Sequence, residues 1–316
     1  MALPICLKSK RMCKVSFSAH ISFGPMESNI GVSGLFLEHL FMRLEDKQEK
    51  DKGLMKKRML ALICLIMCWS IYAATKTENE GSAPKQMSED VRVPQKISGN
   101  PLSAHRVIFI HGSPGSKEAY DDYLNHPSLQ QIELVSVDRL GFGQSSMPVE
   151  TSLKKQAESL LPLLLDNKNT LLVGHSLGGP IALQLALLAP EHVDSLLLIA
   201  SAFDPKLESP KWYNYIADTQ LATWLVPDDM LRSNAEMMVL EHELEKLAAQ
   251  DWASLTMPIV LVHGADDDLA DPGNSYFAKQ RLPNASLKML NNEGHFVLWQ
   301  NVPLLVNEIK AMIEIH

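Results

Sequence analysis

Residues 171–180 read LLVGHSLGGP and place Ser176 between two glycines at the point where an apolar run ends. A strand-like run precedes this stretch, and a helix-like run, IALQLALL, follows it. The spacing Gly174-x-Ser176-x-Gly178 admits two interpretations. It is either a turn that merely needs small residues, or a strained strand-to-helix corner that exposes a serine nucleophile and needs Gly174 and Gly178 for steric room.

The chain around this corner alternates short apolar runs with longer helical patterns. The short runs are nearly continuous in apolar residues, which is typical of strands buried on both faces of a parallel sheet. Strand–helix alternation therefore predicts an α/β fold with a doubly wound, mostly parallel sheet. We expect strands at 106–112, 133–139, 170–176, 195–201, 258–264 and 286–291, and helices at 152–167, 181–190, 234–250 and 302–315.

Composition limits the function classes. The 316 residues are 46% hydrophobic and 21% charged, which is ordinary for a globular chain. The formal net charge of −8 is unevenly spread, because the first 74 residues are basic and the rest is strongly acidic. An acidic body repels phosphates, so we expect no nucleic-acid partner. The four cysteines all precede residue 75, which leaves the body without a disulfide, a thiol nucleophile or a cysteine-based zinc site.

Residues 55–74, MKKRMLALICLIMCWSIYAA, have the parts of a secretory signal: a basic start, an apolar run of about 14 residues and small residues at the end. This segment predicts a signal peptide or a membrane anchor, and with it an exported or membrane-associated protein, periplasmic or secreted if the source is bacterial. We hypothesise that Met55 is the native start, so that 1–54 is disordered or not part of the native protein. Residues 75–103 read as a polar linker into a domain at 104–316.

The longest gap between expected strands runs from about 202 to 257. An insertion at this point of an open α/β sheet lies over the carboxyl ends of the strands, where ligands bind. We expect a small helical cap at about 204–250. Its aromatic residues suggest an apolar acyl pocket, and the alternative is a packing excursion without ligand contact. These residues are Trp212, Tyr213, Tyr215 and Trp224.

A serine nucleophile needs a base, and the base needs an acid that orients it. His295, in NNEGHFVLW, follows the last expected strand and is the candidate base; His175 is not, although it adjoins Ser176. The candidate acids follow the preceding strand, in HGADDDLADP. By their chemistry alone four carboxylates qualify: Asp266, Asp267, Asp268 and Asp271.

With these motifs, about residues 104–314 resemble the α/β-hydrolase family in its serine-hydrolase branch. HGSPG at 111–115 is similar to that family's His-Gly-x-Pro-Gly loop, and DRLGFGQS at 138–145 to its D-R-x-G-x-G-x-S segment, whose role is mainly turn structure. The resemblance implies a nucleophile–acid–histidine order, here Ser176, Asp267 and His295.

Within that family the acid usually stands three residues after the glycine that ends the strand. Here that glycine is Gly264, which selects Asp267; some members place the acid after the earlier strand, which makes Asp204 the alternative. The resemblance also implies an oxyanion hole formed by the N–H groups of Ser113 and Leu177. The Leu177 N–H opens a helix, and a helix N-terminus favours negative charge by itself.

The implied function is that of a carboxylesterase-like serine hydrolase, which cleaves a small-molecule acyl substrate through an acyl-enzyme. It needs no metal and no organic cofactor. A serine at the corner, rather than an aspartate, argues against the epoxide-hydrolase and haloalkane-dehalogenase branches. Lactonase, thioesterase and proline-type aminopeptidase activities use the same residues, and a non-catalytic binding protein of the same fold is an alternative of a different class.

Overall fold

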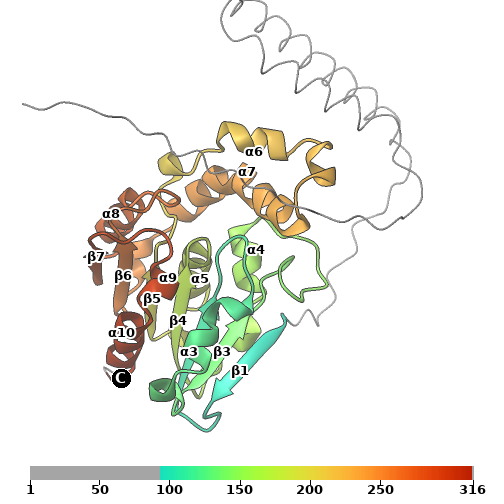
Figure 1. Ribbon diagram of the computed structural model, residues 1–316. Coiled ribbons are helices and arrows are strands. Elements are labelled where there is room, and N and C mark those ends of the chain that lie inside the picture. Colours follow the sequence, from blue (N-terminus) through green and yellow to red (C-terminus); the bar gives the residue numbers. More distant parts are fainter. Residues whose placement is uncertain (1–92, 315–316) are drawn as a thin grey trace, which may run out of the picture. The chain divides into compact units, whose positions relative to one another are not determined.

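The computed structural model describes residues 93–314 (Figure 1). The predictions for residues 1–54, for the signal or anchor at 55–74 and for the first part of the linker, 75–92, concern residues outside this range. None of the helices within the described range is long and apolar enough to cross a membrane.

Seven strands of the described chain form one sheet in the order β1-β3-β2-β4-β5-β6-β7. The neighbouring pairs from β3 to β7 are parallel, so their carboxyl ends share one edge. The predicted α/β fold with a mostly parallel sheet is confirmed, and the six expected strands are all present. The strands are β1 (Gln95–Gly99), β2 (His105–Ile110), β3 (Glu133–Val137), β4 (Asn169–His175), β5 (Ser195–Ile199), β6 (Ile259–Gly264) and β7 (Ala285–Leu290).

Strand β1 corrects the linker predicted for residues 75–103. Its residues pair antiparallel with β3, with Ile97 opposite Val135 and Gly99 opposite Glu133. The strand lies at an edge of the sheet, and its one large apolar side chain, Ile97, is 59% exposed. No alternation of buried apolar residues therefore marks it in the sequence. Backbone pairing, rather than apolar burial, accounts for this strand.

Helices cover both faces of the sheet. One apolar cluster joins Ile108 and Leu172 to α4, α5 and α8, and the other joins Phe109 and Leu197 to α3, α9 and α10. Because successive strand residues point to opposite faces, each central strand is buried on both sides, and its sequence is a continuous apolar run. The α-helices described are α3 (Asp121–Leu124), α4 (Leu153–Glu158), α5 (Gly178–Leu188), α6 (Trp212–Ala217), α7 (Asp228–Ala248), α8 (Gly273–Arg281), α9 (Val297–Gln300) and α10 (Val302–Glu314).

Helices α4 and α8 are among those that differ from the sequence prediction. The helix expected at 152–167 ends after six residues as α4, and a short 3₁₀ helix, η3 (Leu161–Leu163), follows. Pro162 lacks the N–H that would bond the carbonyl oxygen of Glu158, so the α-helical hydrogen bonds end early. Helix α8 was not expected, because its sequence, GNSYFAKQR, is too polar to show a helical stripe.

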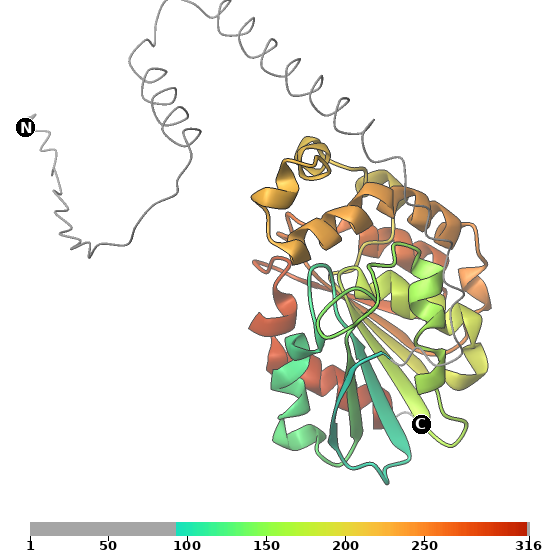
Figure 2. The same cartoon turned by 90° about the vertical axis from the view of Figure 1, so that its right-hand side faces the viewer.

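The cap occupies the segment between β5 and β6. It contains η5 (Pro205–Leu207), α6, η6 (Ala222–Trp224) and the 21-residue α7. In Figures 1 and 2, α6 and α7 lie beyond the carboxyl ends of the parallel strands. Helix α7 starts six residues before the predicted position, and two acidic residues in its first turn favour a helix N-terminus there. The insertion is thus small, helical and next to the edge that carries the motif residues.

Candidate active site

The turn between β4 and α5 holds Ser176 in a strained conformation. Its φ is +53°, a region that residues with a Cβ rarely adopt. Two backbone hydrogen bonds hold it there: the Ser176 N–H donates to Ile199 O at 2.9 Å, and the Gly179 N–H donates to Ser176 O at 3.0 Å. The serine side chain therefore stands at the carboxyl edge of the sheet, between a strand end and a helix start.

The two glycines of the motif are sites of close backbone approach. A Cβ added to Gly174 would lie 2.4 Å from Gly178 O, and one added to Gly178 would lie 2.1 Å from Ile110 O. Both distances are far below van der Waals contact, and both involve backbone oxygens that have little freedom to move. At these two positions the tight turn accepts no side chain.

Asp267 and His295 come together from separate loops at this edge. The Nδ1–H of His295 donates to Asp267 Oδ2 at 2.8 Å. The other carboxylate oxygen, Oδ1, accepts the N–H groups of Leu269 and Ala270, each at 2.9 Å. The alternative acid, Asp204, lies elsewhere: its carboxylate accepts the N–H of Lys206 at 3.0 Å and caps η5. Of the two candidates, the geometry joins Asp267 to the histidine.

A second histidine also faces the acid. His263, fully buried on β6, brings Nε2 to 3.2 Å from Asp267 Oδ2 and 3.0 Å from Ala270 O. Both partners only accept, so this nitrogen carries the proton and donates. Burial raises the pKa of Asp267, but the hydrogen bonds from His263 and His295 outweigh it and hold this pKa well below its usual range. The carboxylate is thus charged at neutral pH.

His175 is buried, and its Nε2–H donates to the backbone oxygen of His295 at 3.1 Å. Burial is the largest cause that lowers the pKa of His175, to about 3. Its ring lies 5.0 Å from the ring of His295. A ring that stays neutral and points its donor at the His295 carbonyl supports the position of His295.

Ser176 Oγ and His295 Nε2 have no hydrogen-bond partner within residues 93–314. Catalytic hydrogen bonds are often long without substrate and shorten only when it is bound, which is compatible with a serine–histidine pair that is not hydrogen-bonded here. The structure brings Asp267 onto His295 and places Ser176 at the end of β4, two strands away from β6, which Asp267 follows.

The loop after β2 lies against the serine. A Cβ added to Gly112 would meet Ser176 Cβ at 2.8 Å. In the described part of the chain, the N–H groups of Ser113 and Leu177 donate to no other group, so both are free to bind an oxygen. The loop, the serine and the start of α5 thus bring two unused N–H donors to one region.

The predicted aromatic acyl pocket in the cap is not what the structure shows. The side chains of Trp212, Tyr213, Tyr215 and Trp224 are 74%, 52%, 58% and 86% exposed. Helix α6 has six residues and buries Asn214, whose side chain bonds Asn234 on α7. A short helix held through a polar residue leaves its aromatic side chains in solvent.

Sequence patterns missed two residues beside the site. Asn274, fully buried on α8, accepts the N–H groups of Phe203 and Asp204 at 2.6 and 2.7 Å and donates to Glu208 at 2.8 Å. Burial raises the pKa of Glu208, although its bond to Asn274 and then the charges of Lys211 and His295 oppose this. A lone asparagine next to a proline and a glycine looks like a turn residue, so no signal pointed to this bridge.

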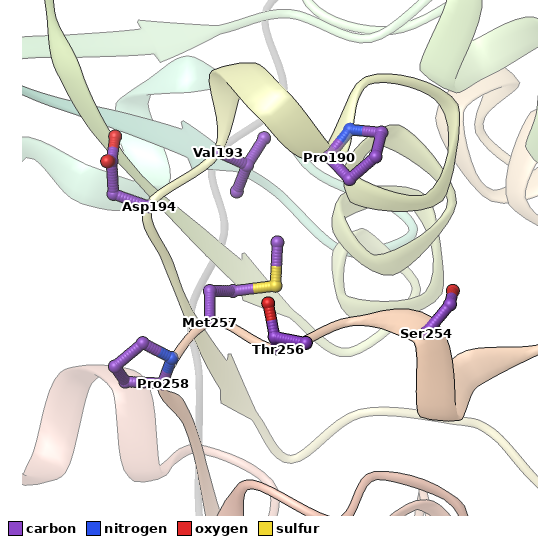
Figure 3. A pocket seen from close by; sticks show the side chains of 7 residues that line it. All are labelled: Pro190, Val193, Asp194, Ser254, Thr256, Met257 and Pro258. Carbon is purple, nitrogen blue, oxygen red and sulfur yellow. The ribbon is translucent and has the colours of Figure 1, made fainter.

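A surface pocket of about 310 Å³ lies apart from these residues (Figure 3). Its lining residues come just before β5 and β6, at the amino ends of the strands, whereas Ser176 and His295 lie at the carboxyl ends. The pocket therefore does not belong to the candidate site. It is lined by Pro190, Val193, Asp194, Ser254, Thr256, Met257 and Pro258. Within residues 93–314, no group of three or more His, Asp or Glu side chains comes together as a metal site.

Comparison with known proteins places the chain in a family. The profile of the alpha/beta hydrolase family matches residues 107–308, and the chain belongs to this family. It is 29% identical over 204 residues to the proposed carbamate hydrolase RutD of Stutzerimonas stutzeri (strain A1501), which covers 54% of this chain and 77% of RutD. It is 23% identical over 252 residues to Lipase 3 of Moraxella sp. (strain TA144), covering 68% of this chain and 78% of the lipase.

A solved structure, the lipase-esterase related protein of Clostridium acetobutylicum ATCC 824, has the same fold. Its TM-score is 0.56 at 17% identity, and the match covers 70% of this chain and 99% of that one. These similarities support a hydrolase at the level of the family.

Proposed function

We propose that this protein is a serine hydrolase that cleaves small ester-type acyl substrates, in the manner of a carboxylesterase. The observation that carries the proposal is the 2.8 Å bond from His295 to the buried Asp267 at the sheet edge where Ser176 is held in its strained turn. A charged acid, a histidine oriented by it and a serine on a strand-to-helix corner are the parts that acyl transfer needs.

In the proposed mechanism, His295 Nε2 takes the proton of Ser176 Oγ as this oxygen attacks the acyl carbonyl carbon. The tetrahedral intermediate collapses, the bond to the leaving-group oxygen breaks, and this oxygen takes the proton from His295. Water then attacks the acyl-enzyme and gives a proton to His295, which returns it to Ser176 as the acid is released. Asp267 stabilises the imidazolium formed in both steps.

The N–H groups of Ser113 and Leu177 are the proposed oxyanion donors. Negative charge develops on the substrate oxygen only as the intermediate forms, so these donors stabilise the transition state more than the bound ester. Loss of one such donor typically costs about 3–4 kcal/mol of activation free energy. Gly174 and Gly178 support this arrangement sterically and take no part in the proton transfers.

A labelling experiment tests the nucleophile. A fluorophosphonate probe is expected to modify Ser176 in the wild-type protein and to leave Ser176→Ala unmodified. The matched control, Ser254→Ala, removes an exposed serine at the far end of the sheet and should be labelled like the wild type. Failure to label Ser176, together with full esterase activity in Ser176→Ala, would rule out the proposal.

The acyl group is tested with a series of p-nitrophenyl esters of rising chain length. Ester, lactone, thioester and proline-amide hydrolysis would all use the same residues, so only the preferred substrate distinguishes them. Lactones, thioesters and proline amides are therefore assayed in parallel with the esters. A non-catalytic binding protein of the same fold would hydrolyse none of them, and its serine would not be labelled.

We propose in addition that residues 55–74 direct export or hold the protein at a membrane. The basic start and the apolar run of this segment support the proposal. N-terminal sequencing of the native protein tests it: the expected start is Met55 or a residue after the apolar run. Peptides from residues 1–50 in native material would contradict the assignment of Met55.

A further inference from the structure

A buried ion pair connects the cap to the loop beside the serine. Arg139, which follows β3, is fully buried, and Glu236 on α7 is 3% exposed. The guanidinium binds both carboxylate oxygens, with Nη1–Oε1 at 2.6 Å and Nη2–Oε2 at 3.1 Å. Paired charges are costly to bury, and removal of one partner leaves the other uncompensated.

The remaining donors of Arg139 point at the loop after β2. Its Nε–H donates to His111 O at 3.0 Å, and its Nη2–H donates to Gly112 O at 3.0 Å. The backbone N–H of Arg139 donates to His111 Nε2 at 3.1 Å, so the ring proton of His111 lies on Nδ1, which donates to Gly112 O at 2.7 Å. Burial, and then the charge of Arg139, lower the pKa of His111 well below its usual range. The His111 ring therefore stays neutral near pH 7, where its Nδ1–H keeps donating to Gly112 O.

Two donors therefore hold a single carbonyl oxygen, that of Gly112. The peptide between Gly112 and Ser113 is planar and trans, so its C=O and its N–H point in opposite directions. Anchoring the oxygen on the Arg139 side directs the Ser113 N–H to the other side of the same plane. Gly112 itself lies against Ser176. The orientation of this one peptide thus decides where the Ser113 donor points.

We propose that Arg139 and Glu236 are positioning residues, which hold the Gly112–Ser113 peptide with its N–H toward the oxyanion. Glu236 fixes the guanidinium, the guanidinium fixes the Gly112 carbonyl, and the carbonyl fixes the donor. A residue of the cap helix thereby sets the oxyanion hole without touching the substrate. The inference rests on the proposed serine-hydrolase function.

The test compares two buried glutamates on the same helix. Glu243 lies two turns after Glu236 and accepts the N–H of Leu153 at 3.0 Å, away from the loop after β2. Glu236→Gln keeps the shape and loses one of the two bonds to Arg139, and Glu236→Ala removes both. Glu243→Gln is the matched control for the loss of a buried carboxylate. Arg139→Lys keeps a positive charge without the planar fork and so cannot hold both partners.

Each variant is titrated with the fluorophosphonate probe, and kcat and KM for a p-nitrophenyl ester are given per labelled site. Removal of one oxyanion donor lowers kcat by about 10²–10³-fold. A displaced donor is expected to lower kcat about tenfold in Glu236→Gln and about 100-fold in Glu236→Ala and Arg139→Lys. KM should change less than threefold, because the ester binds before the charge develops. A boronic acid that mimics the intermediate should lose affinity in parallel with kcat, and Glu243→Gln should keep both values.

A purely structural role would lower the melting temperature and the fraction of labelled sites but leave kcat per site unchanged. If the soluble Glu236→Gln and Arg139→Lys proteins keep kcat within threefold of the wild type, the positioning role is refuted while the hydrolase stands. If wild-type Ser176 is not labelled and Ser176→Ala still turns over ester, the proposed function itself fails. The first result is measured on the Glu236 and Arg139 variants and the second on the wild type and Ser176→Ala, so the two failures can be distinguished.

Discussion

Replacement of Asp267 by asparagine tests the candidate triad with the smallest change in shape. The carboxylate makes two kinds of contact: Oδ1 accepts the N–H groups of Leu269 and Ala270 at 2.9 Å, and Oδ2 accepts from His295 at 2.8 Å and lies 3.2 Å from His263 Nε2. An amide can place its oxygen on one side only. The two backbone donors are fixed, so the oxygen stays with them and the NH₂ group takes the place of Oδ2.

The new amide then donates toward His295 Nδ1, which must accept. The ring proton moves to Nε2, the nitrogen that has to take the proton of Ser176, and the histidine can no longer act as a base. In serine triads this wrong tautomer lowers kcat by about 10⁴, equivalent to about 5 kcal/mol of activation free energy. The NH₂ group also faces the buried donor of His263, which we expect to cost about 1–3 kcal/mol of folding free energy.

The assay is kcat for a p-nitrophenyl ester, measured per folded molecule, in Asp267→Asn and in Asp204→Asn. Asp204 bonds the Lys206 N–H at the cap of η5, so its substitution should leave kcat within about twofold of the wild type. An Asp267→Asn protein that retains a tenth or more of wild-type kcat would refute the tautomer argument. A loss of activity in Asp204→Asn instead would identify Asp204 as the acid.

Asp267→Asn should also change how the free energy of unfolding depends on pH in the acid range. The pKa of Asp267 is depressed in the folded protein, by hydrogen bonds that outweigh its burial. Such a carboxylate contributes stability that is fully present above its unfolded pKa of about 3.9 and is lost as the pH falls toward the folded value. Urea unfolding at pH 5 and pH 3 should therefore show a larger loss of unfolding free energy in the wild type than in Asp267→Asn. Equal losses would contradict the charged state assigned to Asp267.

Three further predictions concern the packing around the site. Gly178→Ala puts a Cβ 2.1 Å from a backbone oxygen of β2 and should cost about 3 kcal/mol in urea unfolding, whereas Gly294→Ala, whose Cβ meets its nearest atom at 3.5 Å, should cost far less. Asn274→Ala leaves two backbone N–H groups without their acceptor and should lower the unfolding free energy by about 2 kcal/mol; no change would argue against the bridge. The double substitution of Trp212 and Trp224 by serine should leave kcat/KM for short esters unchanged, because both side chains are exposed, and a large rise in KM would restore the acyl-pocket interpretation.

The local features of the fold were predictable because each is written in a short stretch of chain. Continuous apolar runs identified six of the seven strands, since a strand buried on both faces has no polar side to break the run. Edge strand β1 was not predicted, since Ile97 faces solvent. The strand is held by its backbone pairing with β3, and its own sequence shows no pattern of buried apolar residues.

The candidate site divides in the same way. The corner at Ser176, with its flanking glycines, was readable from ten residues, because the constraint there is steric and local. The choice of Asp267 among four nearby carboxylates came only from resemblance to a family, and the 2.8 Å contact with His295 appears only once two loops 28 residues apart are folded together. The prediction of an aromatic acyl pocket in the cap was wrong, because residue type alone does not show which side of a short helix packs against the rest of the protein.

By itself the sequence determined the alternation of strands and helices, the strained serine turn and the order of the chemical groups, all consequences of interactions between near neighbours in the chain. Only the tertiary structure decided which partners those groups have. The carboxylate of Glu236 meets Arg139 across 97 residues, and no pattern in either segment predicts it. The reason is that a hydrogen bond or an ion pair is specified by distance and direction in space, and these arise only when the cap, the sheet and its loops are packed together.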